Sequence, residues 1–246
     1  LVDAYGISDA IVVPAPEDQT GLLDRVALAA ADYLSAMRPV PRTLAVSWGR
    51  TLTAIADALP DGWANGVTVV QANGGVSLNR RSGGAATLAT TIAHRAAGQA
   101  VLLPSPAILE RVETKQAIEA DRFVAGILDQ AAHASAYLFT AGPAEADSAH
   151  VENGYLTAED VAELARRGAV GDVLGRYIDA EGNIVDAQLD ARTVGVGLDR
   201  LRAADRAVFV TAGAAKHDIA RTVVSSGLCT VIITDENTAR ALLEER

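Results

Sequence analysis

The stretch VSWGRTL at residues 46–52 contains residue types that suit the binding of a small anion. It joins an apolar run to a helical pattern, so the backbone N–H groups after Gly49 would lie at a helix N-terminus, where unpaired donors and the helix dipole favour negative charge. Ser47 and Thr51 add hydroxyl groups, and Arg50 adds a cation. The stretch does not match GxGxxG or GxxxxGK[ST], so neither a dinucleotide nor a nucleoside triphosphate is the first expectation. A plain strand-to-helix turn explains the same residues equally well.

Two further junctions of this kind occur, QANGGVS at 71–77 and TAGAAKHDIA at 211–220. Asn73 offers both a donor and an acceptor, and Gly74 and Gly75 allow backbone to approach a ligand. Lys216 stands at the start of a helix behind a glycine turn, where a point charge could meet a phosphate. The alternatives are a loop that needs positive φ for the glycines and a solvated surface cation for Lys216.

Asp172, in VGDVLGRYID at 170–179, could accept hydrogen bonds from ligand hydroxyl groups, although a turn carboxylate is the simpler interpretation. The four histidines are scattered without i, i+4 pairing, so we expect no metal site. There is no GxSxG, and no context marks a Cys-His pair or a carboxylate pair as catalytic. We therefore expect no catalytic residues and no cofactor.

Elements that would position these residues alternate between β-branched runs and helical patterns, which predicts an α/β fold with a mostly parallel, Rossmann-like sheet covered by helices on both faces. Strands are expected at 43–47, 67–72, 135–139, 207–213 and 229–235, and the stretch 100–106 is expected to be a strand that Pro104 and Pro106 stop. Helices are expected at 50–59, 84–97, 108–131 in two pieces, 216–225 and 237–245. Gly98 would close the second of these helices in the left-handed conformation.

From about 143 to 190 the rhythm changes and indicates a small antiparallel insertion. TAEDVAELARRG predicts a short helix capped by Thr157 with Asp160 three residues on. GDVLGRYIDAEGNIV predicts a hairpin that turns at 179–183. With no linker or repeat, residues 1–246 are expected to form a single domain.

Composition sets further limits. The chain has 246 residues, of which 50% are hydrophobic, and a formal net charge of −10, which would repel a phosphate backbone. Its single cysteine, Cys229, lies in an apolar run and is expected to be a buried thiol in a reducing compartment. No apolar run approaches the roughly 20 residues of a membrane span, so we expect a cytoplasmic protein without a membrane partner.

Several motifs together resemble a known family. The chain is similar to the C-terminal effector-binding domain of SorC/DeoR-type sugar-binding transcriptional regulators. The similarity rests on five stretches that occur in the same order, AVSWGRTL, VVQANGGVS, LLPSPAIL, GDVLGRYIDAEGNIV and AGAAKHDIARTVVSSGLCTVIITDENTARALL. The resemblance spans nearly the whole chain, and residues 171–243 are its most specific part. It implies a fold related to sugar-phosphate isomerases and glucosamine-phosphate deaminases, which binds a phosphorylated sugar without turnover.

The same resemblance implies partners that this chain does not itself contain. Such regulators carry a helix-turn-helix domain ahead of the effector domain, and it would contact operator DNA. Its absence here agrees with the acidic charge and the abrupt start of the sequence. A homodimer or homotetramer is expected, whose interface shifts when the effector binds.

When the family's motifs are carried over by position, the resemblance implies ligand-binding roles for ten residues. These are Gly49, Arg50 and Thr51 in the phosphate loop, Ser47 as a ligand-binding residue just before it, Asn73, Gly74 and Gly75 in the sugar loop, Asp172 as hydroxyl acceptor, Lys216 as phosphate or sugar contact and Arg192 as a further cation. Some relatives have a lysine or arginine where Asn73 stands, so covalent capture at this position is excluded and a bisphosphate is less expected. Ala212-Gly213 replaces the usual paired glycine before Lys216. Arg192 could instead support its neighbouring strand.

Two other functions fit the same residues. An isomerase or deaminase on this scaffold would need a general base, for which Asp172 is the sole candidate, without a convincing acid partner. A nucleotide-binding α/β protein of another family could use the same loops for a different anion, since one fold hosts many functions. Aldose-ketose conversion and ADP or NAD binding are the respective tests.

Overall fold

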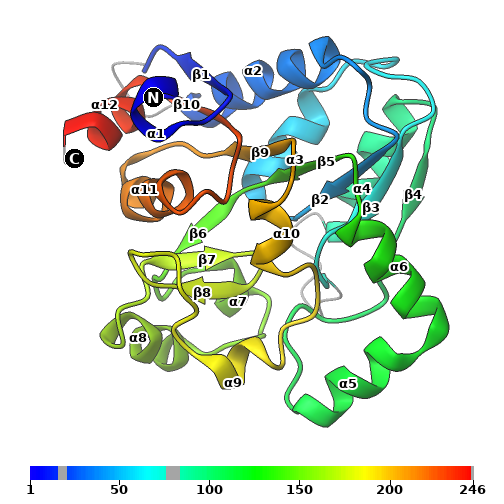
Figure 1. The fold of residues 1–246 in the computed structure, drawn as a ribbon, viewed down its shortest axis with the longest axis vertical. Helices are drawn as coiled ribbons and strands as arrows, with labels where there is room; N and C mark the ends of the chain where they lie inside the picture. Colours follow the sequence, from blue (N-terminus) through cyan, green and yellow to red (C-terminus); the bar gives the residue numbers. More distant parts are fainter. Residues whose placement is uncertain (16–20, 76–83, 245–246) are drawn as a thin grey trace.

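A seven-stranded sheet runs through the middle of the molecule in the computed structural model, which describes residues 1–15, 21–75 and 84–244 (Figure 1). Its strands are β1 (Asp9–Val13), β2 (Thr43–Val46), β3 (Thr68–Gln71), β4 (Gln99–Val101), β5 (Ala136–Phe139), β9 (Ala207–Val210) and β10 (Val231–Asp235). The order is β1-β10-β9-β5-β2-β3-β4, and all neighbours are parallel. The predicted parallel α/β architecture is confirmed.

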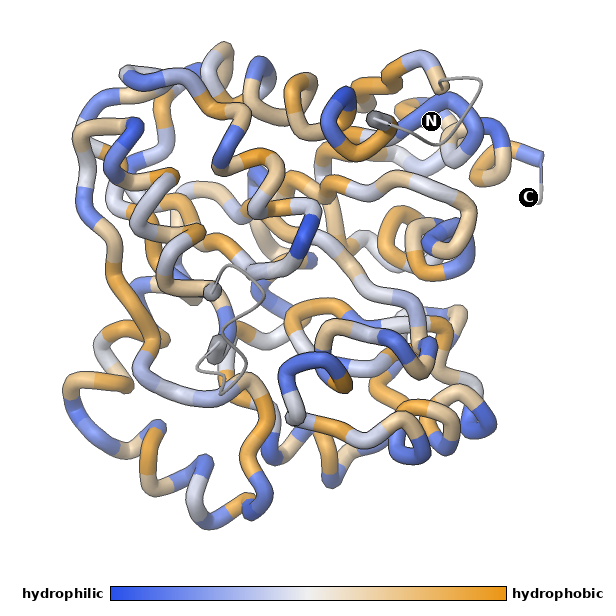
Figure 2. The backbone as a smooth tube through the Cα atoms, turned by 180° about the vertical axis from the view of Figure 1, so that it is seen from behind, coloured by the Kyte–Doolittle hydropathy of each residue, from blue (hydrophilic) through white to orange (hydrophobic). Residues whose placement is uncertain are grey.

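Helices cover both faces of this sheet because the strands alternate their side chains between two cores. Leu44 and Val46 pack with α2 (Leu22–Ala36), α3 (Arg50–Ala58) and α4 (Ala85–Arg95). Ala45 faces the opposite core. That second core is covered by α6 (Arg122–Ala132), α10 (Leu198–Arg202), α11 (His217–Ser225) and α12 (Glu236–Glu244). Figure 2 shows hydrophobic backbone stretches gathered through the interior and hydrophilic ones on outer turns.

The insertion forms a second, antiparallel sheet of β6 (Ala141–Pro143), β7 (Gly171–Val173) and β8 (Arg176–Ile178). Short helices surround it, namely α7 (Ala149–Glu152), α8 (Ala158–Arg166) and α9 (Ala187–Asp190). Thr157 and Asp160 form the predicted capping box at the start of α8. Among the described residues, the other helices are α1 (Val2–Tyr5), α5 (Val112–Ala120) and the 3-10 turn η1 (Ala214–Lys216). Residues 112–132 form two helices, as predicted.

One local prediction was wrong in detail, and a second was incomplete. Ala97 adopts the left-handed conformation after α4, with φ of 46°, whereas Gly98 is needed because a Cβ there would lie 1.9 Å from the Val67 carbonyl oxygen. The hairpin of the insertion turns at Leu174-Gly175, between β7 and β8, where both residues have positive φ. The predicted hairpin turn at 179–183 is also present, because Ile178 forms an antiparallel bridge with Ile184 and the N–H of Gly182 donates to the Asp179 carbonyl.

Cys229 is buried, as predicted, and burial raises the pKa of its thiol to about 12. Among the described residues, no helix has the length and apolar character needed to cross a bilayer.

Candidate functional site

A cavity of about 500 Å³ opens at the carboxyl ends of the central strands, where ligands of open α/β sheets usually bind. Seven of the ten predicted site residues line it, and these are Ser47, Gly49, Arg50, Thr51, Asn73, Asp172 and Lys216. They come from the β2–α3 loop, the end of β3, β7 and the turn after β9. The parallel sheet and the insertion therefore bring together residues that are up to 169 positions apart, from Ser47 to Lys216.

One end of the cavity is suited to an anion. Helix α3 begins here at Arg50, and its N-cap Gly49 has φ of 136° and no side chain that could cap the first turn. The first turn of α3, with its unpaired N–H groups and the positive end of the helix dipole, thus forms part of the cavity wall. Thr51 is buried beside them, with 5% of its surface exposed. This geometry is the one that the VSWGRTL stretch predicted.

Lys216 reaches the same end from η1. Its Nζ lies 3.4 Å from Thr51 Oγ1 and 3.3 Å from Thr140 Oγ1, and it donates to both hydroxyl groups. Burial lowers the pKa of Lys216 to about 8, against the attraction of Asp172, and the positive charge of Arg50 lowers it further. Arg50 and Lys216 both line this end of the cavity, and an anion bound between them would stabilise the protonated lysine.

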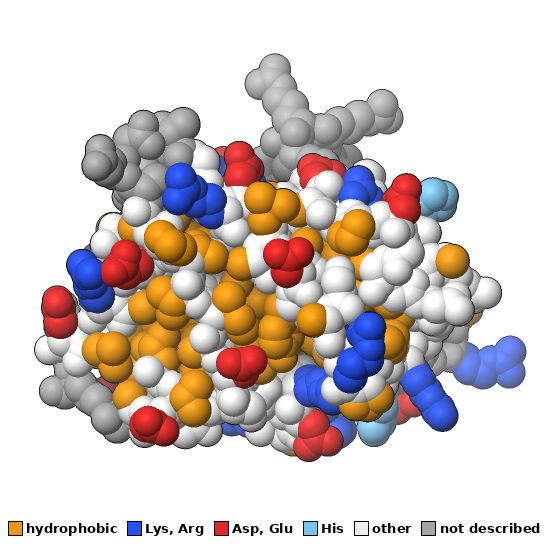
Figure 3. All heavy atoms as spheres, turned by 90° about the horizontal axis from the view of Figure 1, so that it is seen from above, with side chains coloured by type: hydrophobic (Ala, Val, Ile, Leu, Met, Phe, Trp, Pro, Cys, Tyr) orange, Lys and Arg blue, Asp and Glu red, His pale blue; other side chains and the backbone are white. Residues whose placement is uncertain are grey.

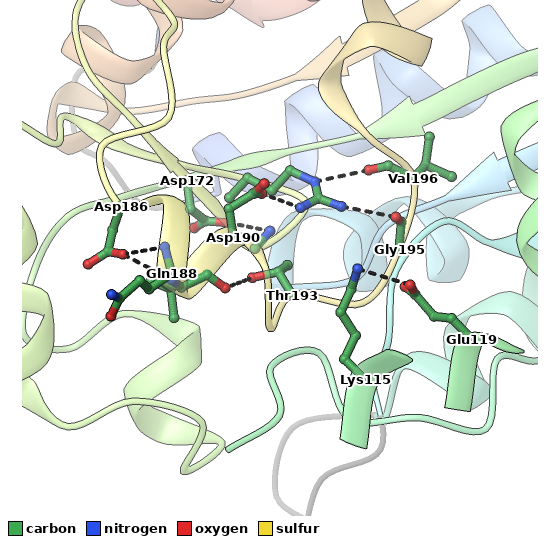
Figure 4. Close-up of polar contacts among 12 residues, drawn as sticks. Lys115, Glu119, Asp172, Asp186, Gln188, Asp190, Thr193, Gly195 and Val196 are labelled. Carbon is green, nitrogen blue, oxygen red and sulfur yellow. Dashed lines mark hydrogen bonds and ion pairs between the residues drawn. The ribbon is translucent and has the colours of Figure 1, made fainter. Parts of the chain in front are cut away.

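Asn73 lines the cavity further in and is 3% exposed. Within the described part of the chain, its Oδ1 atom has no hydrogen-bond donor. A buried acceptor left without a donor costs about 1–3 kcal/mol, so this oxygen is suited to a ligand hydroxyl. The backbone of Asn73 forms an antiparallel bridge with Gly195. The Arg176 guanidinium donates to the carbonyl groups of Gly195 and Val196 and so supports this segment (Figure 4).

Asp172 presents its carboxylate to the cavity from β7. Oδ2 accepts the N–H of Gly175 at 2.9 Å, and Oδ1 lies 3.7 Å from His150 Nδ1. His150 Nδ1 also lies 3.2 Å from the Tyr177 hydroxyl oxygen. On the facing strand, a Cβ on Gly142 would lie 2.7 Å from Asp172 Oδ1, so glycine makes room for the carboxylate. One carboxylate oxygen is thus fixed by backbone while the other is available to a hydroxyl donor.

Among the lining residues that were not predicted, Trp48, Thr140 and His150 contact the predicted ones. Trp48 donates from Nε1 to the Gly74 carbonyl at 2.7 Å, and its ring meets that of His150 edge-on at 5.7 Å between centroids. Thr140 follows β5 and accepts from Lys216. Trp48 belongs to the VSWGRTL stretch, but a large aromatic side chain there suggests core packing. His150 and Thr140 carry no local motif, so their positions follow from the tertiary fold.

The other three predicted residues lie outside the described lining of the cavity. A Cβ on Gly74 would lie 2.1 Å from the Pro106 carbonyl oxygen, and one on Gly75 would lie 2.3 Å from Ala85 Cβ. The Arg192 guanidinium donates to the Leu109 carbonyl at 2.8 Å, which is the supporting role weighed above. Packing explains these three residues, and ligand contact stays a prediction for them.

Comparison with known proteins identifies the family. Residues 1–244 match the family model described as "Putative sugar-binding domain". The chain belongs to this family of sugar-binding domains. The domain is 31% identical over 246 residues to the deoxyribonucleoside regulator of Bacillus subtilis (strain 168), an alignment that covers 100% of this chain and 78% of that regulator.

Solved structures share the fold of this sugar-binding domain. A domain of "a possible sugar-binding transcriptional regulator" from Arthrobacter aurescens TC1 is 30% identical, with a TM-score of 0.84 over 99% of this chain and 94% of that one. The full-length sorbitol operon regulator SorC from Klebsiella pneumoniae gives a TM-score of 0.88 at 23% identity, over 99% and 79%. These relatives are transcriptional regulators, so the predicted resemblance is confirmed and an isomerase or deaminase is not favoured.

Proposed function

We propose that this domain senses a phosphorylated sugar and that its occupancy controls DNA binding by a helix-turn-helix domain of the same regulator. The observation that carries the proposal is Lys216, a half-buried cation that donates to Thr51 and Thr140 beside Arg50 and the start of α3. A phosphoryl group supplies the charge and the acceptors that this end lacks. The carbohydrate part then extends toward the Asn73 Oδ1 atom and the Asp172 carboxylate.

The balance of charge in the cavity favours a monophosphate. Arg50 and Lys216 supply positive charge, whereas Glu145, Asp147 and Asp172 also line the cavity and supply negative charge. A second phosphoryl group near these carboxylates would be repelled. A ligand with one phosphoryl group at the Arg50 and Lys216 end and hydroxyl groups near the carboxylates fits both ends of the cavity.

Regulation requires that the ligand bind two states of the protein with different affinity, typically by about 1–3 kcal/mol. Relatives of this domain are named as regulators of deoxyribonucleoside and sorbitol genes, which supports a role in carbohydrate-responsive transcription. A sensor of metabolic sugar phosphates that acts on operator DNA would work in the cytoplasm, as a homodimer or homotetramer.

The test is a thermal-shift panel of hexose and pentose monophosphates, the same sugars without phosphate, inorganic phosphate, ADP and NAD. We expect a sugar monophosphate to raise the melting temperature and the Thr51→Ala/Lys216→Ala double variant to lose that rise. Asp218→Ala, a change on the exposed side of α11, serves as a control that keeps it.

Three results would count against the proposal. A rise with ADP or NAD alone would favour the nucleotide alternative. Aldose-ketose turnover would favour the enzyme. No rise with any monophosphate would remove the basis for a phosphosugar sensor.

A further inference from the structure

The outward face of α2 carries an apolar stripe between opposite charges. Leu28 is 55% exposed, and the partly exposed Ala29 lies beside it. Arg25 and Asp32 are exposed on the same face, because positions i, i+3, i+4 and i+7 of a helix align. Figure 3, which looks down on the end of the molecule that contains α2 and β1, shows hydrophobic side chains across its middle with charged ones around them.

This stripe is complementary to itself. Arg25 and Asp32 lie at equal distances on either side of the Leu28–Ala29 pair, about 10 Å apart along the helix at 1.5 Å per residue. If a second α2 lies antiparallel across it, with a two-fold axis at that pair, Leu28 of each copy meets Ala29 of the other. Arg25 of each copy then faces Asp32 of the other, which gives two identical ion pairs.

The neighbouring sheet edge extends the same surface. Strand β1 pairs with β10 and, within the described residues, with no strand on its other side. Its sequence DAIVV contains no lysine or proline, which usually protect an edge strand. Ile11 and Val13 pack on the α2 side of the sheet. An apolar edge beside an apolar helix face gives a partner more surface than the helix alone.

We propose that a second copy of this chain docks on the outer face of α2 and the adjacent β1 edge, in a two-fold arrangement with Arg25 paired to Asp32 across the axis. The occupant is a copy of the same chain because the order of charges along α2 fits its own antiparallel image. A parallel arrangement would place like charges together.

The same helix reaches the ligand cavity. Leu22 and Leu23, in the first turn of α2, line the cavity that holds Lys216. A ligand that repositions these leucines moves the helix whose outer face forms the contact. This coupling rests on the proposed function, whereas the docking surface itself does not.

Sedimentation equilibrium of the purified chain without ligand tests the surface. Arg25→Asp and Asp32→Arg each replace two ion pairs by two like-charge contacts, so we expect each to raise the dimer Kd on the order of tenfold or more. The double charge swap restores the pairs in reverse and should bring the Kd back toward wild type. Leu28→Glu should also dissociate the dimer, whereas Phe123→Glu, at a 72% exposed side chain on α6, should leave it intact.

A monomeric wild-type chain, or a double swap as weak as the single changes, would overturn the surface. So would a dimer that Phe123→Glu disrupts and Leu28→Glu does not. Circular dichroism of each variant tests whether it is folded. If Leu28→Glu does not fold, the charge swap still tests the surface. A monophosphate that raises the melting temperature but leaves the dimer Kd unchanged would overturn the coupling alone.

Discussion

Sugar-phosphate affinity should depend on pH through Lys216. Burial lowers the pKa of Lys216 to about 8 in the ligand-free protein, Asp172 opposes the shift and Arg50 adds to it. The protonated lysine is the form that binds an anion. As pH rises through 8 this form is lost, so affinity should be nearly constant below pH 7 to 7.5 and fall above 8.

The size of the change in apparent Kd follows from the fraction of Lys216 that is protonated. About nine tenths of Lys216 is protonated at pH 7 and about one tenth at pH 9, so the apparent Kd should rise roughly tenfold between them. The ligand does not contribute, because a phosphate monoester with a second pKa near 6 is already a dianion over this range. A bound dianion should raise the pKa of Lys216, so binding at pH 8 should take up about half a proton.

Isothermal titration calorimetry from pH 7 to 9, in buffers of different ionisation enthalpy, measures both quantities. Lys216→Arg is the matched control, because arginine stays charged and should give a flat profile at any absolute affinity. A flat wild-type profile without proton uptake would refute the role of Lys216. The stability of the ligand-free protein also changes with pH, so it must be measured separately at each pH. The unfolded chain holds more protons between pH 8 and about 10, so stability without ligand should rise across that window.

Three further predictions follow from single positions. Asn73→Ala should weaken a sugar monophosphate about tenfold and leave inorganic phosphate unchanged in the same titration, since the lost acceptor serves a hydroxyl group; equal losses for both would contradict this. Gly98→Ala should lower the free energy of unfolding by about 1–3 kcal/mol in urea, because its Cβ would lie 1.9 Å from a carbonyl oxygen, whereas Gly126→Ala on α6, with no atom within 4 Å, should be neutral or stabilising. With Trp63→Phe, the remaining Trp48 in the cavity wall should change its emission on ligand binding, and an unchanged spectrum would place the ligand elsewhere.

Local patterns predicted most of the fold because the elements that surround the site are regular. Strands β2 and β3 and helix α3 follow hydrophobic periodicity that a short window contains. Strand β1 was not predicted, since it forms by pairing with β10, more than 200 residues further along the chain. Gly98 was assigned to a helix end because sequence does not reveal which carbonyl passes close to it.

Some site residues were likewise predictable from local sequence, and others were not. Thr51 and Lys216 were found because each stands at a strand-to-helix junction, where sheet topology brings loops together. Thr140 was missed because its hydroxyl is near Lys216 only in the folded chain. His150 was missed for a similar reason, since its contact with Asp172 links α7 to β7. Arg192 had both interpretations from the start, and its contact with the Leu109 carbonyl is the supporting one.

The most direct test of the sensor is a crystal structure with the monophosphate that gives the largest rise in melting temperature. The account predicts the phosphoryl group at the start of α3, within hydrogen-bond distance of Lys216 Nζ and Thr51, and a sugar hydroxyl on the Asn73 Oδ1 atom. A phosphoryl group bound away from Lys216, with the α3 end of the cavity holding solvent, would contradict it.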